Sequence, residues 1–339
     1  MKPLLILLAA LALAGCTPFL VQQPLSPGAA FSGPRLEDDW VVSFDGARLG
    51  LRRWEPADQQ PWAVIVGLHG MNDYSNAFHL AAPWWAEHGI ATYAYDQRGF
   101  GRSPGRGVWA GDALMVQDLR TVTALVRRKY PDAIIAVAGE SMGGAVAAEA
   151  FASSDPPAAD RLILLAPAVW GWNEQPLPNK TLLWVAANLT PGKVYEPPRW
   201  LTSRITPTDN RAELIAMGHD PLMIWGARSD ALYGLVSMMQ RGFDAVGRAA
   251  VPTFYLHGER DQIIPRDAAL DAAARLKSTD RSADYARGYH LLLRDHQAKN
   301  VWADVAAFIR DPAGPLPSGA PPIPGSPALG PSQHAQAGL

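Results

Sequence analysis

One short segment of the chain combines a potential nucleophile with the small residues that such a nucleophile needs. Residues 139–143 read Gly-Glu-Ser-Met-Gly, with Ser141 at the centre of a Gly-x-Ser-x-Gly pattern. A reactive serine on a very tight strand-to-helix turn needs glycine neighbours, because larger side chains would clash there. The N-terminus of the following helix favours developing negative charge. The segment therefore predicts acyl transfer through an ester on Ser141.

Such a serine also needs a base and a group that orients this base, because its hydroxyl alone is a weak nucleophile. Asp261 follows a late apolar strand, and His290 lies between the last predicted strand and the last predicted helix. Both follow strand ends, at the edge where open parallel sheets bind ligands. A Gly-x-Ser-x-Gly turn is accompanied by the chain order serine, acid, histidine. We therefore predict a triad of Ser141, Asp261 and His290.

Other assignments of these roles fit the chain order less well. His257 precedes the predicted acid, His296 falls inside the last predicted helix, and Asp230 lies within a long insertion. The structural alternatives are a turn or helix-cap carboxylate for Asp261 and a helix-capping or surface residue for His290.

An oxyanion that forms on the substrate needs hydrogen-bond donors. The loop after the first long apolar strand reads His69-Gly70-Met71-Asn72. Such a loop typically offers one backbone N–H, and the residue after the nucleophile offers another. We predict the N–H groups of Met71 and Met142 as these donors. His69 is predicted to brace the loop, and the charged residues of 96–103 are predicted to brace the scaffold rather than react.

Strands and helices alternate through the body of the chain, which we place at residues 37–310. Asp45-Gly46 lies between two alternating stretches and predicts a hairpin. Continuous apolar runs predict buried strands at 62–68, 90–95, 134–138, 162–165, 253–256 and 283–286. Helical spacing predicts helices at 74–88, 112–130 and 295–309, with a further Ala-rich helix after Ser141. This alternation predicts a mainly parallel sheet covered on both faces, with an antiparallel edge.

One insertion breaks the alternation of strands and helices. Residues 168–250 contain no clear strand and carry many Trp, Met and Pro residues. The segment is too long for a loop in a compact domain, so we predict a mostly helical cap over the sheet. An apolar cap would enclose an acyl channel, although Met and Trp also fill ordinary cores. The remaining body, 37–167 and 251–310, is predicted to form the core.

Taken together, these motifs resemble the monoacylglycerol lipase and lysophospholipase branch of the α/β-hydrolases. The likeness covers about residues 40–310 and rests on His69-Gly70, 96–103, 139–144, 257–265 and 288–290. It implies the α/β-hydrolase fold, with a helical cap above a mainly parallel sheet. It also implies Ser141 as nucleophile, His290 as base and acid, Asp261 as its orienter, and Met71 and Met142 as oxyanion donors. The cap sequence departs from the family, so the acyl chain length and the head group stay open.

The implied function is hydrolysis of lipid-like esters with one acyl chain, through an acyl-enzyme, without a metal or organic cofactor. An acyltransferase or a small-amide peptidase of the same fold is the first alternative. A non-catalytic lipid-binding surface lipoprotein is the second, since a fold can serve as a scaffold alone. Relatives that break carbon–halogen bonds or epoxides are disfavoured, because they use Asp where this chain has Ser141.

The N-terminus has the features of an export signal. Residues 1–16 hold one positive charge, a short apolar run and Leu13-Ala14-Gly15-Cys16. That ending resembles the bacterial lipoprotein box, in which the cysteine is lipidated, although an ordinary signal peptide is the alternative. We expect a lipid on Cys16, a linker over 17–36, and a body anchored to a membrane of the bacterial envelope. Thr17 favours the periplasmic face of the outer membrane.

Composition excludes some functions. Of 339 residues, 48% are apolar, which suits a large core, and the formal net charge of −2 argues against nucleic-acid binding. Cys16 is the only cysteine, so an intrachain disulfide is impossible. Residues 311–339 are rich in Pro, Gly, Ala and Ser, and we expect this tail to be disordered.

Overall fold

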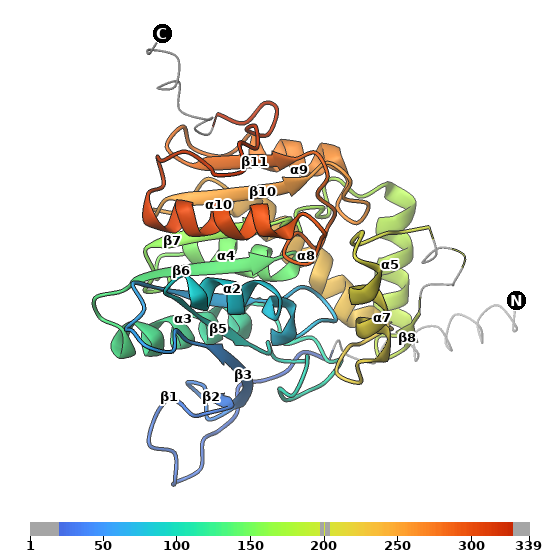
Figure 1. Ribbon diagram of the computed structural model, residues 1–339. Coiled ribbons are helices and arrows are strands. Elements are labelled where there is room, and N and C mark those ends of the chain that lie inside the picture. Colours follow the sequence, from blue (N-terminus) through green and yellow to red (C-terminus); the bar gives the residue numbers. More distant parts are fainter. Residues whose placement is uncertain (1–19, 197–199, 201–203, 328–339) are drawn as a thin grey trace, which may run out of the picture.

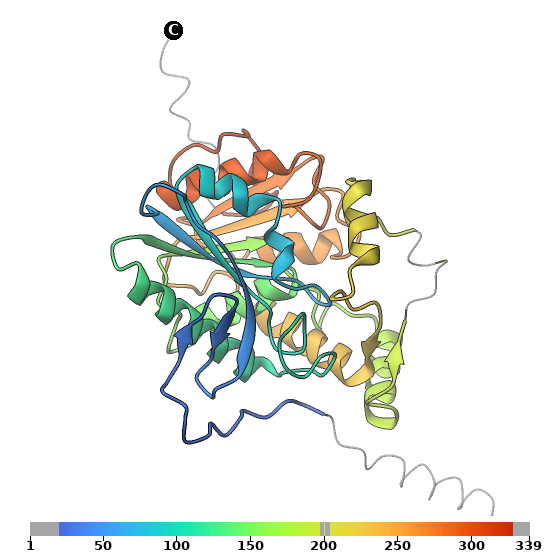
Figure 2. The ribbon, with the colours of Figure 1, turned by 60° about the horizontal axis from the view of Figure 1, so that its bottom comes forward.

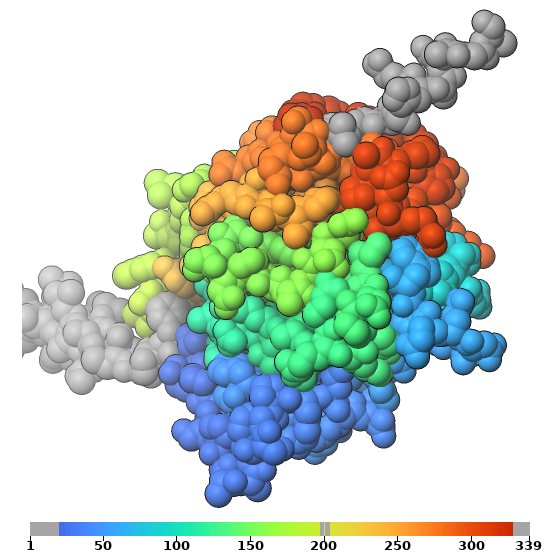
Figure 3. All heavy atoms as spheres, turned by 90° about the vertical axis from the view of Figure 1, so that its left-hand side faces the viewer, coloured from blue at the N-terminus to red at the C-terminus, as the bar shows by residue number. Residues whose placement is uncertain are grey.

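A twisted sheet forms the centre of the molecule (Figure 1). The computed structural model describes residues 20–196, 200 and 204–327. In this part of the chain the sheet has nine strands in the order β1-β2-β3-β5-β4-β6-β7-β10-β11. Its strands are β1 (Arg35–Leu36), β2 (Trp40–Val42), β3 (Arg48–Trp54), β4 (Ala63–Leu68), β5 (Ile90–Tyr95), β6 (Ile134–Glu140), β7 (Arg161–Leu165), β10 (Thr253–Gly258) and β11 (Arg281–Tyr285). In this order, each strand from β5 through β4, β6, β7 and β10 to β11 pairs in parallel with the next, whereas β1, β2 and β3 add an antiparallel edge. Figure 3, seen from the end away from the cap, shows the N-terminal part of the body in blue at one side of the molecule and the C-terminal part in red at the other.

Helices cover both faces of the sheet, as predicted. One face is covered by α3 (Asp112–Lys129), α4 (Met142–Ala152), α8 (Ser229–Ala245) and α9 (Arg266–Ala273). The other is covered by η1 (Ser75–Phe78), α2 (Ala81–Glu87) and α10 (Ala298–Arg310). Side chains of a strand point alternately to the two faces, so Val64 and Val66 of β4 join the first core cluster and Ile65 joins the second. The predicted α/β-hydrolase fold is confirmed.

The cap lies beyond one end of the sheet, on the right in Figure 1. It contains α5 (Leu177–Leu189), α7 (Arg211–His219) and a short antiparallel pair, β8 (Val194–Tyr195) with β9 (Ala227–Arg228). The predicted boundary of 250 is wrong, because much of α8 packs in the core rather than in the cap. Gly242 of α8 lies so close to α4 that a Cβ on it would be 2.7 Å from the Cβ of Ala145.

Residues 311–327 are ordered against the core, so the predicted disorder of this part of the tail is wrong. Ile323 is buried, and its N–H donates to the Ser282 hydroxyl at 3.2 Å. The carbonyl of Pro321 accepts a 2.8 Å hydrogen bond from the N–H of Asp284 in β11. Composition predicted disorder because apolar residues are few, but Ile323 and Leu316 suffice to anchor a chain whose backbone polar groups find partners.

The described part of the linker also lies against the body. The backbone N–H of Gln22 donates to the carbonyl of Trp109 at 2.9 Å, and the N–H of Leu25 donates to Asp45 at 2.8 Å. We call residues 20–25 the strap. The signal peptide with Cys16, and the tail beyond 327, lie outside the described residues. No helix in the described residues is long and apolar enough to cross a membrane.

Candidate active site

Ser141 lies on the turn between β6 and α4 with a backbone φ of 53° and ψ of −117°. A positive φ is unfavourable for a residue with a Cβ and persists only where the surroundings impose it. Here the close packing of the turn against neighbouring backbone imposes it, and only glycine fits on either side of the turn. A Cβ on Gly139 would lie 2.3 Å from the carbonyl oxygen of Gly143, and one on Gly143 would lie 2.4 Å from that of Leu68. The predicted strand–turn–helix geometry of this motif is therefore present.

Replacing Gly143 with alanine tests this geometry. The new methyl group would strike the β4 backbone, so we expect a loss of stability of roughly 1–3 kcal/mol, as for overpacked cores. A displaced Ser141 would lower kcat/KM by about 100-fold or more. The control is Gly218→Ala in α7, where a Cβ meets nothing within 4 Å. Thermal denaturation and ester hydrolysis are measured for both variants. Equal stability and equal activity of the two would refute the steric role of Gly143.

His290 and Asp261 lie together, as predicted. The Nδ1 of His290 lies 2.8 Å from Oδ2 of Asp261, whose other oxygen accepts the N–H groups of Ile263 and Ile264 at 2.7 and 3.1 Å. Their loops follow β11 and β10, and they meet because Gly258 permits it. A Cβ on Gly258 would lie 2.5 Å from the backbone of Gly288.

The charges of this pair support each other. Burial alone would raise the pKa of Asp261, but the His290 charge, its hydrogen bond and the two N–H groups hold it below its ordinary value. Burial alone would lower the pKa of His290, but the charge of Asp261 and its hydrogen bond raise it above the ordinary value, with a smaller contribution from Glu140. Since Nδ1–H donates to Asp261, Nε2 is the nitrogen left for a proton transfer.

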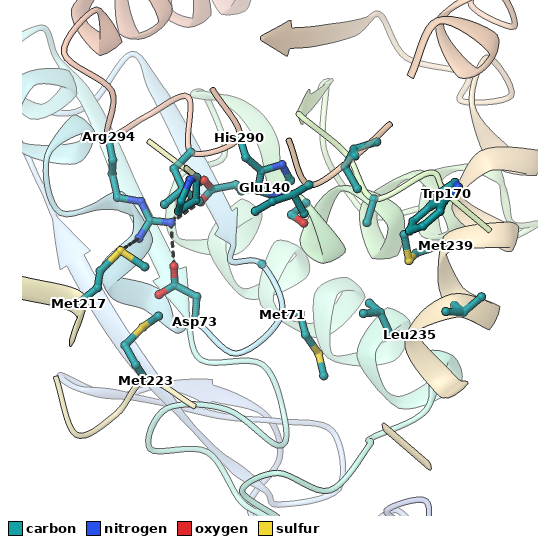
Figure 4. A pocket seen from close by; sticks show the side chains of 18 of the residues that line it. Met71, Asp73, Glu140, Trp170, Met217, Met223, Leu235, Met239, His290 and Arg294 are labelled. Atoms are coloured by element: carbon teal, nitrogen blue, oxygen red, sulfur yellow. Dashed lines mark hydrogen bonds and ion pairs between the residues drawn. The ribbon is translucent and has the colours of Figure 1, made fainter. Parts of the chain in front are cut away.

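Ser141 and His290 line one cavity of about 380 Å³. In Figure 4 the labelled lining side chains lie on both sides of His290, and we call these two sides of the cavity its arms. Trp170, Leu235 and Met239 line one arm, and Asp73, Arg294 and Met217 surround the other (Figure 4). The first arm is apolar, and cap and α8 residues supply it. A small apolar cavity with a few polar groups is typical of a ligand site.

The predicted oxyanion donors lie in the loop after β4, for Met71, and at the start of α4, for Met142, and these two segments meet at Ser141. A Cβ on Gly70 would lie 3.2 Å from the Cβ of Ser141, so only glycine lets this loop approach so closely. Within the described residues, the backbone N–H groups of Met71 and Met142 have no hydrogen-bond partner. Met71 also lines the cavity. Both N–H groups are thus available to a bound substrate.

His69 is buried and braces the loop, as predicted. Its Nε2 accepts the backbone N–H of Gln97 at 2.9 Å, which leaves Nδ1–H to donate to the Gly70 carbonyl at 2.7 Å. Burial lowers the pKa of His69, so the ring stays neutral. The loop 96–103 also braces the scaffold, since Arg98 pairs with Asp45 and Asp118 at 2.8 and 2.6 Å.

The rival residues have other partners. His257 is buried in β10 with Nδ1 2.8 Å from Asp284, and Asp230 pairs with Arg228 at 2.6 Å. The backbone N–H of His296 donates to Asp209 at 2.8 Å. None of these three residues is among the described residues that line the catalytic cavity.

A buried charge cluster beside the triad was missed by the sequence analysis. Arg294 is 2% exposed, and its guanidinium lies 2.7 Å from Asp73 and 3.0 Å from Glu140 (Figure 4). It also lies 3.7 Å from Glu213. Glu140 precedes Ser141, whereas Glu213 belongs to cap helix α7. Burial raises the pKa of Glu140, although Arg294 opposes this. The cluster therefore joins the nucleophile turn, the catalytic loop and the cap.

The fold and the site define the class of this protein. A serine on a strand–helix turn, followed in the chain by an acid and a histidine at the same edge of a mainly parallel sheet, is the arrangement of an α/β-hydrolase. Residues 59–297 match the family described as "Serine aminopeptidase, S33", and the chain belongs to that family. Family, fold and site together make it a serine hydrolase of carboxylic esters.

Curated relatives cover most of the chain. It is 27% identical over 283 residues to a monoacylglycerol lipase of Mycolicibacterium smegmatis, covering 78% of this chain and 93% of that protein. It is 26% identical over 293 residues to the monoglyceride lipase of Mus musculus, covering 83% and 93%. The resemblance read from the motifs is therefore confirmed.

Solved structures agree on the fold. A soluble variant of the Saccharomyces cerevisiae monoglyceride lipase, bound to a substrate analog, superimposes with a TM-score of 0.67 at 19% identity, covering 85% of this chain and 98% of that one. A carboxyl esterase from Bacillus coagulans gives a TM-score of 0.64 at 20% identity, covering 80% and 96%.

Proposed function

We propose that the protein hydrolyses lipid-like esters with one acyl chain, such as monoacylglycerols or lysophospholipids, through an acyl-enzyme on Ser141. The observation that carries this proposal is the cavity, where Ser141 and His290 meet an apolar arm lined by Trp170, Leu235 and Met239. An acyl chain fits that arm. The opposite arm, with Asp73 and Arg294, suits a polar head group. The names of the two curated relatives support the same substrate class.

The proposed reaction has two stages. Nε2 of His290 takes the proton of Ser141 as its Oγ attacks the ester carbonyl, and Asp261 stabilises the imidazolium that forms. The oxyanion accepts hydrogen bonds from the N–H groups of Met71 and Met142. The C–O bond to the alcohol breaks, and the alcohol leaves with the proton from His290. Water then repeats the sequence, which releases the fatty acid and restores Ser141.

A substrate panel tests this function. The purified protein is assayed with monoacylglycerols and lysophospholipids of several chain lengths, p-nitrophenyl esters and aminoacyl amides, with and without an added alcohol. We expect release of free fatty acid from the single-chain lipids. Cleavage of amides alone would favour the peptidase alternative, and products esterified to the added alcohol would favour an acyltransferase.

The pH dependence of the reaction follows from His290. The ring must be neutral to accept a proton, and Asp261 raises its pKa above the ordinary 6.5. We therefore expect kcat/KM to rise with pH, with a midpoint above 6.5, because kcat/KM reports groups of the free enzyme. In Asp261→Asn the residual activity should have its midpoint at lower pH. A parent midpoint below 6.5 would contradict the assignment.

We also propose that Cys16 carries a lipid that anchors the protein in the bacterial envelope, at the periplasmic face of the outer membrane. The Leu-Ala-Gly-Cys ending of the leader and the lack of any other cysteine support this proposal. Metabolic labelling with palmitate should mark the parent and not Cys16→Ser. Equal labelling of both would refute it, and separation of inner and outer membranes tests the location.

A further inference from the structure

The cap carries an exposed apolar surface that takes no part in the proposed reaction. Helix α5 contains one charged residue, Lys180, yet among its side chains only Ala187 is buried. A helix exposed to water normally carries a polar outer face. The exposed apolar residues, which we call the cap face, are Leu177, Leu182, Trp184, Val185 and Leu189 of α5 with Val194 and Tyr195 of β8. Leu182 is 71% exposed and Trp184 is 55% exposed. Exposed apolar patches of this kind mark a surface that meets a partner or a membrane.

The composition of the cap face favours a lipid bilayer as its occupant. Residues 175–195 contain no acidic side chain but include Lys180, Lys193, Trp184 and Tyr195. Trp and Tyr are the residues enriched where protein meets the interface of a bilayer, and Lys is attracted by anionic lipids. The ammonium of Lys193 lies 5.1 Å from the ring centroid of Tyr195.

The strap brings Leu20, the first described residue, to the side of this same surface. The backbone N–H of Leu20 donates to Asp230 at 3.3 Å, and the N–H of Asp230 donates at 3.1 Å to the carbonyl of Pro191, just after α5. Figures 1 and 2 both show the blue strap running to the side of the cap. The side chain of Gln22 fixes the next part of the strap to the body, because its Nε2 donates a 2.8 Å hydrogen bond to the carbonyl of Val108.

The reach of the chain then limits where a lipid can be. Cys16 lies four residues before Leu20, so it can be at most about 14 Å from that residue. A lipid on Cys16 must sit in a bilayer, and this step rests on the anchor proposed above. The bilayer surface is consequently close to Leu20, and therefore close to the end of α5.

We infer that the strap and the cap face dock together on one bilayer, so that the lipid anchor orients the cap towards the membrane. A hollow of about 310 Å³ beside α5 is lined by Leu182, Leu183 and Tyr195, and Gln175 lines both this hollow and the catalytic cavity. A single-chain lipid thus meets the enzyme at the membrane, on the side where the acyl arm lies. The anchor supplies the affinity and the cap face supplies the orientation.

Site-specific quenching tests the orientation. Full-length lipidated protein is inserted in vesicles of phosphatidylethanolamine and phosphatidylglycerol that carry a nitroxide lipid. A thioether-linked Cys16 does not react with thiol reagents, so Leu182→Cys provides a single site for a fluorescent label. Asp132→Cys is the matched control, because Asp132 is exposed in the turn before β6, at the opposite edge of the sheet from Ser141. We expect the label at 182 to lose most of its fluorescence and the label at 132 to keep it.

Two charge variants distinguish the contribution of the cap face to the orientation from the contribution of the anchor to binding. Trp184→Glu should abolish the quenching at 182 while the protein stays bound to the vesicles, whereas Ala57→Glu, at an exposed position beyond β3, should leave it unchanged. No quenching at 182, or equal quenching at 182 and 132, would overturn the inference. Mass analysis that finds no lipid on Cys16 would also overturn it. Ester hydrolysis in detergent micelles, measured on the same samples, tests the proposed function separately.

Discussion

Ser141→Ala is expected to remove essentially all ester hydrolysis, with a fall in kcat of roughly 10⁴–10⁶-fold, as found when a nucleophile is removed from a triad. The proposed acyl-enzyme cannot form without its Oγ. Labelling by a fluorophosphonate, which phosphonylates only an activated serine, should disappear in the same variant. The side chain makes no hydrogen bond that stabilises the described fold, so the melting temperature should change little.

A second serine serves as the control for this experiment. Ser154 is exposed after α4, and Ser154→Ala should keep both the labelling and the activity of the parent. Undiminished labelling of Ser141→Ala would show that another residue reacts. No labelling of a folded parent would count against an assembled triad and would favour the non-catalytic alternative.

Arg294→Met is expected to destabilise the protein by roughly 3–5 kcal/mol, because removing one partner of a buried ion pair leaves the others uncompensated. Asp73 and Glu140 would remain buried beside the nucleophile turn without their cation. Activity should fall as well, since Glu140 immediately precedes Ser141. Chemical denaturation measures the stability, and Arg294→Lys, which keeps the charge, should recover part of it.

The loss should depend on pH in a defined direction. Arg294 lowers the pKa of Glu140, so without it burial raises this pKa further above the value of the unfolded chain. A folded-state pKa that is raised contributes stability below the unfolded pKa, and this contribution is lost as pH rises through the folded value. The free energy of unfolding of Arg294→Met should therefore fall further below that of the parent at pH 8 than at pH 5. A difference that does not change with pH would contradict this account.

Strands and the triad were predictable because their signals are local. A buried parallel strand reads as a continuous apolar run, and Ile90–Tyr95 begins and ends where the run does. The glycines around Ser141 are required by atoms a few residues away, so the pattern is visible in one segment. Helix α9 was missed, because its buried residues include four alanines that give little apolar contrast.

The charge cluster could not be predicted in this way. Asp73, Glu140, Glu213 and Arg294 come from four separate segments, and each alone looks like a residue of a solvated surface. Their pairing exists only because the sheet brings the ends of β4, β6 and the loop after β11 together while α7 lies over them. The order of residues 311–327 could not be predicted either, because it depends on the burial of two apolar side chains, Leu316 and Ile323, against a core built from distant segments.

The sequence by itself determined the class of fold, the position of the nucleophile and the order of the triad, because each depends on local periodicity or on glycines that a tight turn requires. Only the tertiary structure decided which apolar side chains enclose the catalytic cavity and which stay exposed on the cap. That choice depends on how α8 packs against α4 and how α5 packs against α8. Pattern alone cannot distinguish a Trp that lines the cavity, such as Trp170, from one that faces outward, such as Trp184, since burial depends on contacts between distant segments.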